Sequence, residues 1–270
     1  MLIQSLLGKR DLLIPYFNFE KVDKGNMTSP ALLEIYKLRY EVYCLECHFL
    51  NAEDYANQLE VDEFDEYSTH ISAFNMENSI IGSVRLVQPQ KNQMYPFETH
   101  CSVFDGFQYP DRAKTGEISR LVVKKSYRRR RGDSMEGVSK DFVEKGEVAA
   151  IKPVVDTHRR TNNSPLLLLG MYRELYRYSR QNNIYFWYAA MERSLAKSLE
   201  KMGFKFVPIG PETDYYGKVT PYMVDLQELN ARLRRENRFL AAWFNDEPIP
   251  LWIMVKTLVN SYVVTHSKHK

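Results

Sequence analysis

The chain has 270 residues, of which 44% are hydrophobic and 26% charged, and its formal net charge is +3. This composition excludes a wholly disordered chain, and the length suffices for one large domain with a full core. The net charge is too small to indicate a nucleic-acid partner by itself, but the charges are uneven. Five acids lie within residues 60–66, and seven bases lie within residues 120–131.

The first residues lack the basic region, long apolar run and small-residue cleavage site of a secretory signal. No stretch has eighteen uninterrupted apolar residues, as a membrane-spanning helix would need. Three cysteines in such a chain are most simply reduced thiols. We therefore expect a cytoplasmic protein.

Ser29 followed by Pro30 predicts the start of a helix that runs to about residue 49. Arg39 falls inside the apolar stripe of this helix, so its guanidinium is expected to point towards the core or a cleft. The acidic segment 60–66 follows as a loop. Two strands of a hairpin are then predicted over residues 69–76 and 79–87, and the second carries Arg85 among apolar residues.

The next predicted strand, residues 117–123, begins with a carboxylate, a hydroxyl and a guanidinium and then turns apolar. Charges inside a sheet must be paired or change their protonation, so this strand indicates chemistry as well as packing. The two-residue period of a strand puts Glu117 and Ser119 on one face. Arg120 then lies on the other face unless a bulge re-aims it.

A basic, glycine-ended loop (residues 124–132) follows, and residues 132–163 show little periodicity, so we expect a mobile insert or one that folds with a partner. A helix from Ser164, a buried central strand at 184–190 and a helix at 191–202 ending at Gly203 come next. Strands are predicted at 204–209 and 219–226, and Pro221 places the last one at an edge or a bulge.

Residues 227–244 predict an amphipathic helix, and residues 249–264 are apolar enough to pack on the domain, on a second subunit or on a bilayer surface; we expect packing first. The order of elements predicts an α/β fold with a central mixed, twisted sheet flanked by helices. We assign residues 1–226 to one domain, with 132–163 as its insert, and residues 227–270 to a C-terminal helical extension.

Four motifs carry a family resemblance: residues 38–43 (LRYEVY), 60–65 (EVDEFD), 82–86 (GSVRL) and 116–120 (GEISR). They resemble the GNAT-like acyltransferases, within them the group of acyl-homoserine-lactone synthases and N-acyl amino acid synthases. Residues 191–195, 203–204 and 216–222 are similar to the acyltransferase associated with PEP-CTERM/exosortase systems. The resemblance thus covers most of the chain.

The resemblance implies a GNAT-like acyltransferase fold and acyl transfer from a thioester to an amine. The donor would be acyl carrier protein or acyl-coenzyme A as a co-substrate, the acceptor an amino acid or similar small amine, and no bound cofactor or metal is expected. One alternative is an acyl-homoserine-lactone synthase using S-adenosylmethionine. Another is a non-catalytic module that binds acyl groups or nucleic acid, although base-stacking aromatics do not alternate with the arginines of the loop, so we expect no nucleic acid.

Thioester aminolysis needs a base for the amine, and Glu117 is the candidate, with Ser119 and Arg120 as further catalytic residues. The alternative is that Glu117 is merely paired with Arg85 or Arg120 inside the sheet. The predicted acceptor clamp consists of Arg39, Asp62, Asp65 and Arg85, which could equally be a structural cluster that holds the acidic loop. The predicted site for phosphopantetheine and its carrier protein consists of Arg128, Arg129, Arg130, Arg131 and Gly132, for which a solvated charge run is the alternative.

Cys44 and Cys47 precede His48 in the spacing of a haem-attachment motif, and a zinc site with His100 and Cys101 is conceivable. The cysteines of the first helix lie on its packed side, and no second C-x-x-C pair follows. We therefore predict core cysteines.

Overall fold

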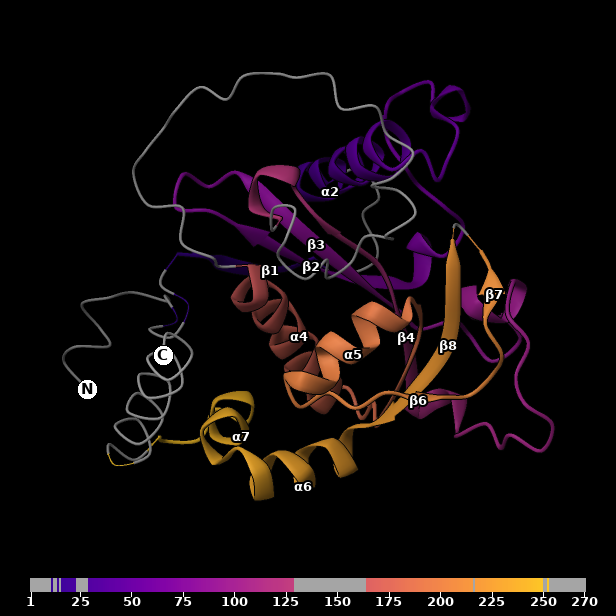
Figure 1. The fold of residues 1–270 in the computed structure, drawn as a ribbon. Coiled ribbons are helices and arrows are strands. Elements are labelled where there is room, and N and C mark those ends of the chain that lie inside the picture. The colour runs from indigo at the N-terminus through magenta and orange to yellow at the C-terminus, as the bar shows by residue number, and fades with distance from the viewer. Residues whose placement is uncertain are drawn as a thin grey trace, which may run out of the picture.

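The computed structural model describes residues 11, 14, 16–22, 29–128, 164–215, 217–249 and 252. Its centre is an eight-stranded sheet in the order β1-β2-β3-β4-β5-β8-β6, with β7 paired to β8 (Figure 1). The strands are β1 (Asn18–Val22), β2 (Ser68–Phe74), β3 (Ile80–Val87), β4 (Thr115–Val123), β5 (Phe186–Met191), β6 (Val207–Pro208), β7 (Thr213–Asp214) and β8 (Lys218–Asp225). All neighbouring pairs are antiparallel except β4 and β5, so the sheet is mixed, as the sequence predicted.

Helices cover both faces of this sheet. The helix α2 (Pro30–Tyr40) lies on one side of β3 and β4, and α4 (Ser164–Gln181) lies on the other side, against β1–β3 (Figure 1). The helix α5 (Arg193–Lys201) follows β5, and α6 (Leu226–Glu236) and α7 (Arg238–Phe244) follow β8. Asn237 separates the last two helices and caps α7, because its side chain accepts a hydrogen bond from the Leu240 N–H. The single helix predicted over residues 227–244 is thus two.

The first helix is also shorter than predicted. The Ser29 hydroxyl caps its start by accepting a hydrogen bond from the Leu32 N–H, as expected. After Tyr40 the chain widens into a π-helical turn, Glu41–Glu46, and His48 then adopts a positive φ of 52°. The imidazole Nδ1 of His48 lies 3.0 Å from the Cys44 carbonyl oxygen, at the end of this turn. The helix therefore stops before residue 49.

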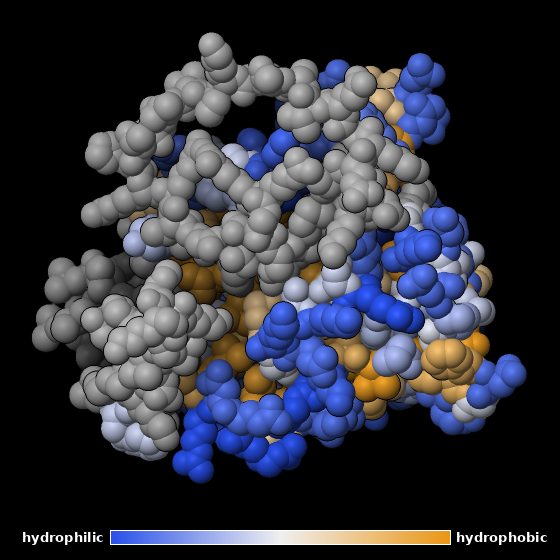
Figure 2. Space-filling view, in the orientation of Figure 1, coloured by the Kyte–Doolittle hydropathy of each residue, from blue (hydrophilic) through white to orange (hydrophobic). Residues whose placement is uncertain are grey.

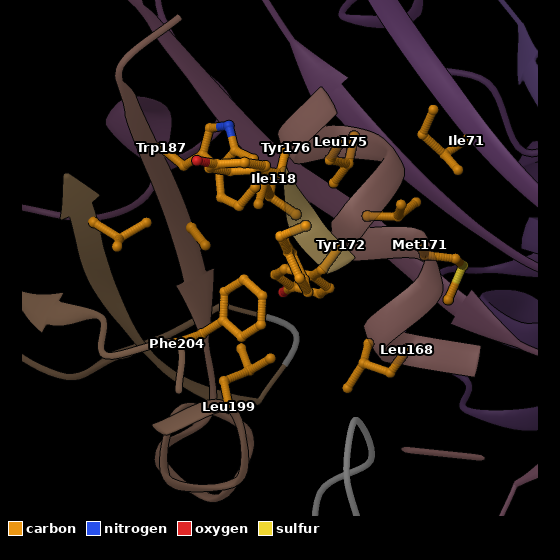
Figure 3. Close-up of a cluster of buried hydrophobic side chains, with 14 of the residues drawn as sticks. Ile71, Ile118, Leu168, Met171, Tyr172, Leu175, Tyr176, Trp187, Leu199 and Phe204 are labelled. Atoms are coloured by element: carbon orange, nitrogen blue, oxygen red, sulfur yellow. The ribbon is translucent and has the colours of Figure 1, made fainter. Parts of the chain in front are cut away.

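The main hydrophobic core lies on the α4 side of the sheet (Figure 3). It joins residues of α4, β4 and β5 to the C-terminal helices, and at its centre Tyr172 packs edge-on against Trp187 and Phe204. A smaller cluster on the opposite face contains Tyr95, Phe97 and Tyr188. Consecutive β5 residues therefore serve two different cores, which explains why this strand reads as wholly apolar.

The strands β4 and β5 pair over only three positions, from Thr115↔Phe186 to Glu117↔Tyr188. Beyond Glu117, β4 continues to Val123 along β3, whereas β5 stays with β8. The two halves of the sheet therefore separate in the middle of β4. This separation creates the cavity described below.

Three expectations about strands need correction. The sequence analysis missed β1, a partly exposed strand with two charges that pairs along β2. The strand predicted at 204–209 is reduced to the two residues of β6. Pro221 does not mark an edge, because β8 pairs with β5 on one side and with β6 and β7 on the other. The proline falls between the short partners β6 and β7, and its carbonyl accepts a hydrogen bond from the Ile209 N–H.

Figure 2 shows a largely hydrophilic surface on this face, with hydrophobic areas beside α4 and near β6, where Val207 is exposed. Among the described residues, no helix combines the length and hydropathy needed to cross a bilayer. The predicted insert at 132–163 and most of the apolar stretch at 249–264 lie outside the described residues.

Candidate functional site

A cavity of about 180 Å³ opens where β4 and β5 part. Residues from both faces of the sheet line it: Glu117 and Ser119 come from the face of the Phe97 cluster, whereas Ile118 and Tyr172 come from the α4 core. Its other walls are mainly apolar, namely Tyr43, Phe49, Leu50, Pro96, Leu121, Ala189, Ala190, Met191, Leu195, Tyr215 and Val219, with Arg120 and Glu192 as polar members. The cavity therefore crosses the sheet from a polar side to an apolar side.

Glu117 lies in the wall of this cavity and is only 2% exposed. One carboxyl oxygen accepts a hydrogen bond from the Phe97 N–H at 3.0 Å, and the other oxygen has no hydrogen-bond partner among the described residues. Burial raises the pKa of Glu117 to about 8, against the weaker opposing effects of that hydrogen bond and of Arg85. A carboxyl group with this pKa can accept and release a proton near neutral pH.

The alternative that Glu117 is neutralised inside the sheet finds no support in its contacts. Within the described part of the chain, no ion pair joins Glu117 to Arg85 or Arg120. Both guanidiniums are instead bound to carboxylates of the acidic loop. This leaves Glu117 without a counter-ion and explains the direction of its pKa shift.

Ser119 lies beside Glu117 in the cavity wall, as the two-residue period predicted. Its hydroxyl oxygen accepts a hydrogen bond from Arg85 Nε at 3.0 Å. Because Arg85 occupies the acceptor side of the hydroxyl, the Ser119 proton remains free to be donated into the cavity. Arg85 thus orients Ser119.

Arg120 adopts a positive φ of 49° next to a register shift between β3 and β4. This bulge turns the side chain towards the acidic loop, where Arg120 Nη2 lies 2.9 Å from both Glu60 Oε1 and Asp62 Oδ2. Arg120 also lines the cavity, with its guanidinium over the Tyr43 ring. The bulge that the sequence analysis named as an exception is therefore present.

The predicted clamp residues do meet in one ion-pair cluster. Arg39 binds Glu60 and, at 2.7 Å, Asp65; Arg85 binds Asp62 and, at 2.8 Å, Asp65. With Arg120, the cluster contains three guanidiniums and three carboxylates. Glu60 was the member that the sequence analysis had not assigned, although it lies in the same acidic motif.

The members of this cluster differ in their exposure to solvent. The side chains of Arg39, Asp65 and Arg85 are fully enclosed, whereas those of Asp62 and Arg120 are each 14% exposed. Burial alone would raise the pKa of Asp65, but the adjacent Arg39 and Arg85 hold it well below its usual range. This geometry favours a structural role for the three enclosed residues. Asp62 and Arg120 keep access to solvent.

His70 on β2 is a further buried member that the sequence did not reveal. Its ring is 1% exposed, lies edge-on to Tyr36, and has one nitrogen 3.6 Å from Asp65. Burial, together with the nearby Arg39 and against the attraction of Asp65, lowers the pKa of His70 to about 3. The imidazole is therefore neutral, and the contact with Asp65 is not an ion pair.

Of the predicted carrier-binding residues, only Arg128 is described. It donates a hydrogen bond to the Val123 carbonyl at 2.6 Å and forms an ion pair with Glu46 of the π-helical turn. Arg128 thereby ties the end of β4 to the first helix. Arg129, Arg130, Arg131 and Gly132 lie outside the described residues, so their assignment stays a prediction.

The three cysteines are buried and form no disulfide, which confirms their prediction as core residues. Burial raises the pKa of the Cys44 and Cys101 thiols to about 11, so neither is a thiolate at neutral pH. In the part of the chain that the structure describes, no cluster of three metal-ligating side chains occurs.

Comparison with known proteins supports the fold. Residues 38–137 match a family model described as an acetyltransferase (GNAT) domain. Among solved structures, the acyl-homoserine lactone synthase BjaI, determined with MTA, aligns with a TM-score of 0.56 at 18% identity over 81% of this chain and 89% of its own. TofI, solved with an inhibitor and MTA, aligns with a TM-score of 0.55 at 13% identity over 80% of this chain and 96% of its own. No curated protein matches the sequence.

These matches agree with the predicted fold. Residues 38–137 are similar to a GNAT domain, and the chain has a mixed, helix-flanked sheet that matches GNAT-like acyltransferase folds, as the sequence predicted. At identities this low, the solved structures establish the fold alone, and function must be argued from the site.

Proposed function

We propose that this protein is an N-acyltransferase that moves a fatty acyl group from an acyl carrier protein thioester to the amine of an amino acid or a similar small molecule. One observation carries the proposal: Glu117, which forms no ion pair with any described residue and has a pKa of about 8, lies in a cavity that crosses the sheet between β4 and β5. The matching GNAT domain and the lactone-synthase fold support the same class of reaction.

The reaction uses the two sides of the cavity differently. The acceptor amine approaches from the polar side, and Glu117 removes its proton directly or through a water molecule. The amine nitrogen then attacks the thioester carbonyl carbon, a C–N bond forms, and the carbonyl oxygen gains negative charge. The Ser119 hydroxyl, oriented by Arg85, can donate a hydrogen bond to that oxygen. Collapse breaks the C–S bond, and the departing thiolate takes the second proton from the nitrogen, so that an amide and a thiol are released. Glu117 then returns the first proton to solvent.

For the predicted clamp, we infer a division of roles. Arg39, Asp65 and Arg85 are too enclosed to touch a substrate and instead hold the acidic loop in place. Asp62, which retains exposed surface, can bind the ammonium group of an arriving amine. Arg120, in the cavity wall, can contact an acceptor carboxylate.

A carrier protein is acidic as a rule, so the basic residues 128–132 remain the proposed docking site. The proposed link to PEP-CTERM/exosortase systems rests on the sequence resemblance alone.

A lactone synthase is the second candidate, because several structures of this fold are lactone synthases and one contains SAM and isopentyl-CoA. Lipids extracted from cells that express the protein or its Glu117→Gln variant, analysed by mass spectrometry, test both candidates. N-acyl amino acids that depend on Glu117 support the main proposal. Acyl-homoserine lactones support the second, and no new lipid in either strain refutes both.

A further inference from the structure

A short 3₁₀ turn, η4 (Pro96–Thr99), supplies the only hydrogen bond that Glu117 receives from the described residues. The donor is the Phe97 N–H, at 3.0 Å from a carboxyl oxygen of Glu117. The first N–H groups of a helical turn have no partner within the turn, so this one is available to the carboxylate. A hydrogen bond to the charged form of a carboxyl group favours its ionisation, and Glu117 must be ionised to act as a base. The position of η4 therefore affects the reaction.

An ion pair between Glu98 and Arg112 fixes this turn from outside the cavity. Glu98 accepts a hydrogen bond from the Tyr95 N–H at 2.7 Å and so caps the start of η4. Two guanidinium nitrogens of Arg112 donate to the two oxygens of the same carboxylate, at 2.6 and 3.2 Å. Arg112 Nη2 also donates to the Gln93 carbonyl at 2.6 Å. Arg112 thereby binds both the turn and the segment that leads into it.

Tyr95 connects this ion pair to the strand that carries Glu117. Its ring is 1% exposed, and the Arg112 Cζ atom lies 4.5 Å from the ring centre. Its hydroxyl donates to the Thr115 carbonyl at 3.1 Å, on β4 and two residues before Glu117. The contacts of Arg112 and Tyr95 therefore fasten η4 to the start of β4.

Electrostatics acts in the same direction as these contacts. Glu98 is a like charge that raises the pKa of Glu117, whereas the hydrogen bond from Phe97 lowers it. Removal of Arg112 would leave Glu98 without its counter-ion and would free η4 to move away from the carboxylate. Both effects would raise the pKa of Glu117. The other charged or titratable groups that face Glu117 are Arg85 on β3, Arg120 on β4, the Cys101 thiol and the Tyr95 phenol.

Arg112 lies outside the reacting centre. It is not in the wall of the cavity between β4 and β5, and its side chain is 30% exposed. An ion pair with this much solvent contact contributes little to stability. Replacement of Arg112 should therefore leave a folded protein in which an altered pH profile can be measured.

We propose that Arg112 is a positioning residue for the reaction: through Glu98 and Tyr95 it holds η4 so that the Phe97 N–H stays on the Glu117 carboxylate. This inference rests on the proposed function and adds a residue outside the cavity on which the basicity of Glu117 depends.

The first test is the pH profile of acyl transfer from octanoyl carrier protein to a mixture of amino acids, with the full-length protein and its Arg112→Met variant. We expect kcat/KM of the variant to level off about 1 pH unit higher, as for loss of a hydrogen bond to a charged group. At pH 7 kcat/KM should fall roughly 10-fold, because less Glu117 is ionised, and at high pH it should return to near the wild-type value.

Two further variants identify the cause. Arg112→Lys keeps the positive charge but lacks the planar fork that binds Glu98 and Gln93 together, so it should give an intermediate shift. Arg234→Met removes an exposed ion pair with Glu247 on the C-terminal helices and is the matched control. Its profile should equal that of the wild type.

Direct titration of Glu117 separates failure of this inference from failure of the proposed function. NMR of protein labelled with ¹³C-glutamate follows the Glu117 carboxyl signal, assigned by its loss in Glu117→Gln, across the pH range in the same variants. A higher midpoint in Arg112→Met, without transfer by any of the proteins, supports the positioning role and refutes the N-acyltransferase. An unchanged midpoint and profile, or a shift that Arg234→Met reproduces, overturns the inference and leaves the proposed function standing. If Arg112→Met does not fold, the same comparison with Arg112→Lys decides.

Discussion

The chemistry of the site depends on the pKa of one carboxyl group, that of Glu117. Among the described residues, Glu117 has a single backbone donor and no guanidinium partner, although Arg85 and Arg120 occupy the same region. The acidic loop binds both arginines, so their guanidiniums form ion pairs with Asp62, Asp65 and Glu60. The loop thereby keeps Glu117 basic. A free Arg85 beside Glu117 would lower its pKa and make it a poor base.

The raised pKa of Glu117 predicts the pH profile of the reaction. A base must be ionised to act, so kcat/KM should rise with pH and level off above about 8. Glu117→Gln should lower the rate by about 10²- to 10⁴-fold and remove this part of the profile. The acceptor amine titrates equally in both proteins, so the difference between the two profiles isolates Glu117. Glu77→Gln, an exposed carboxylate in the hairpin turn, is the matched control. A Gln variant with unchanged rate and profile would show that Glu117 is not the base.

The same shift predicts how stability depends on pH. The folded pKa of about 8 lies above the ordinary value of 4.5, so between these values the folded state holds a proton that the unfolded chain has lost. The free energy of unfolding of the wild type should therefore fall, relative to that of Glu117→Gln, as pH rises from about 5 to about 8. Urea titrations of both proteins at pH 5, 6.5 and 8 measure this difference. A constant difference across the series would contradict the raised pKa.

At the scale of elements, the ion-pair cluster connects α2, the acidic loop, β3 and β4. Arg39 comes from α2, Arg85 from β3 and Arg120 from β4, and the three carboxylates come from the loop between α2 and β2. Buried charges of this kind add little net stability compared with an apolar core, but removal of one partner leaves the others uncompensated.

Replacement of Arg39 tests this structural role. Arg39→Met keeps most of the volume but leaves Glu60 and Asp65 without one of their partners, so the free energy of unfolding should fall by about 3–5 kcal/mol. Lys114→Met, which breaks the exposed pair with Asp111, should cost less than about 1 kcal/mol. Denaturant unfolding of both variants gives these values. An Arg39 variant that is as stable as the control but has a raised KM for the acceptor would support the clamp instead.

The sequence predicted most elements because their signals are local. The Ser29 cap, the apolar run at β5 and Gly203 after α5, with its φ of 97°, all act within a few residues. The sequence did not predict the structure of segments that depend on a partner far away in the chain. β1 has an ordinary mixed pattern and becomes a strand only by pairing with β2, and Pro221 sits inside the sheet because β6 and β7 happen to flank it.

The features of the site also divide into those with a local signal in the sequence and those without one. A strand that starts Glu-x-Ser-Arg reveals unusual charges, and the two-residue period correctly put Glu117 and Ser119 in one wall. The positive φ of Arg120, the neutral His70 and the place of Tyr172 on the cavity left no local signal. Tyr172 reads as one more residue in an apolar helix stripe, and only the separation of β4 from β5 places it on a cavity.

At the scale of the whole molecule, the sheet separates a polar layer from an apolar layer, and the cavity described above connects the two. A polar face with the ion-pair cluster lies on the α2 side, a large apolar core lies on the α4 side, and the cavity joins them where β4 and β5 diverge. A reaction that unites a charged amine with a fatty chain needs both environments within one short distance. The fold supplies them from consecutive residues of β4.

The most direct test of this account follows the release of thiol from octanoyl carrier protein in a single turnover, with and without a mixture of amino acids, in the wild type and in Glu117→Gln. We expect thiol release that requires the amine, equals the amide formed, and falls at least 100-fold in the variant. Thiol release that proceeds without amine or amide, or at the same rate in Glu117→Gln, would contradict an acyl transfer to nitrogen that depends on this carboxylate.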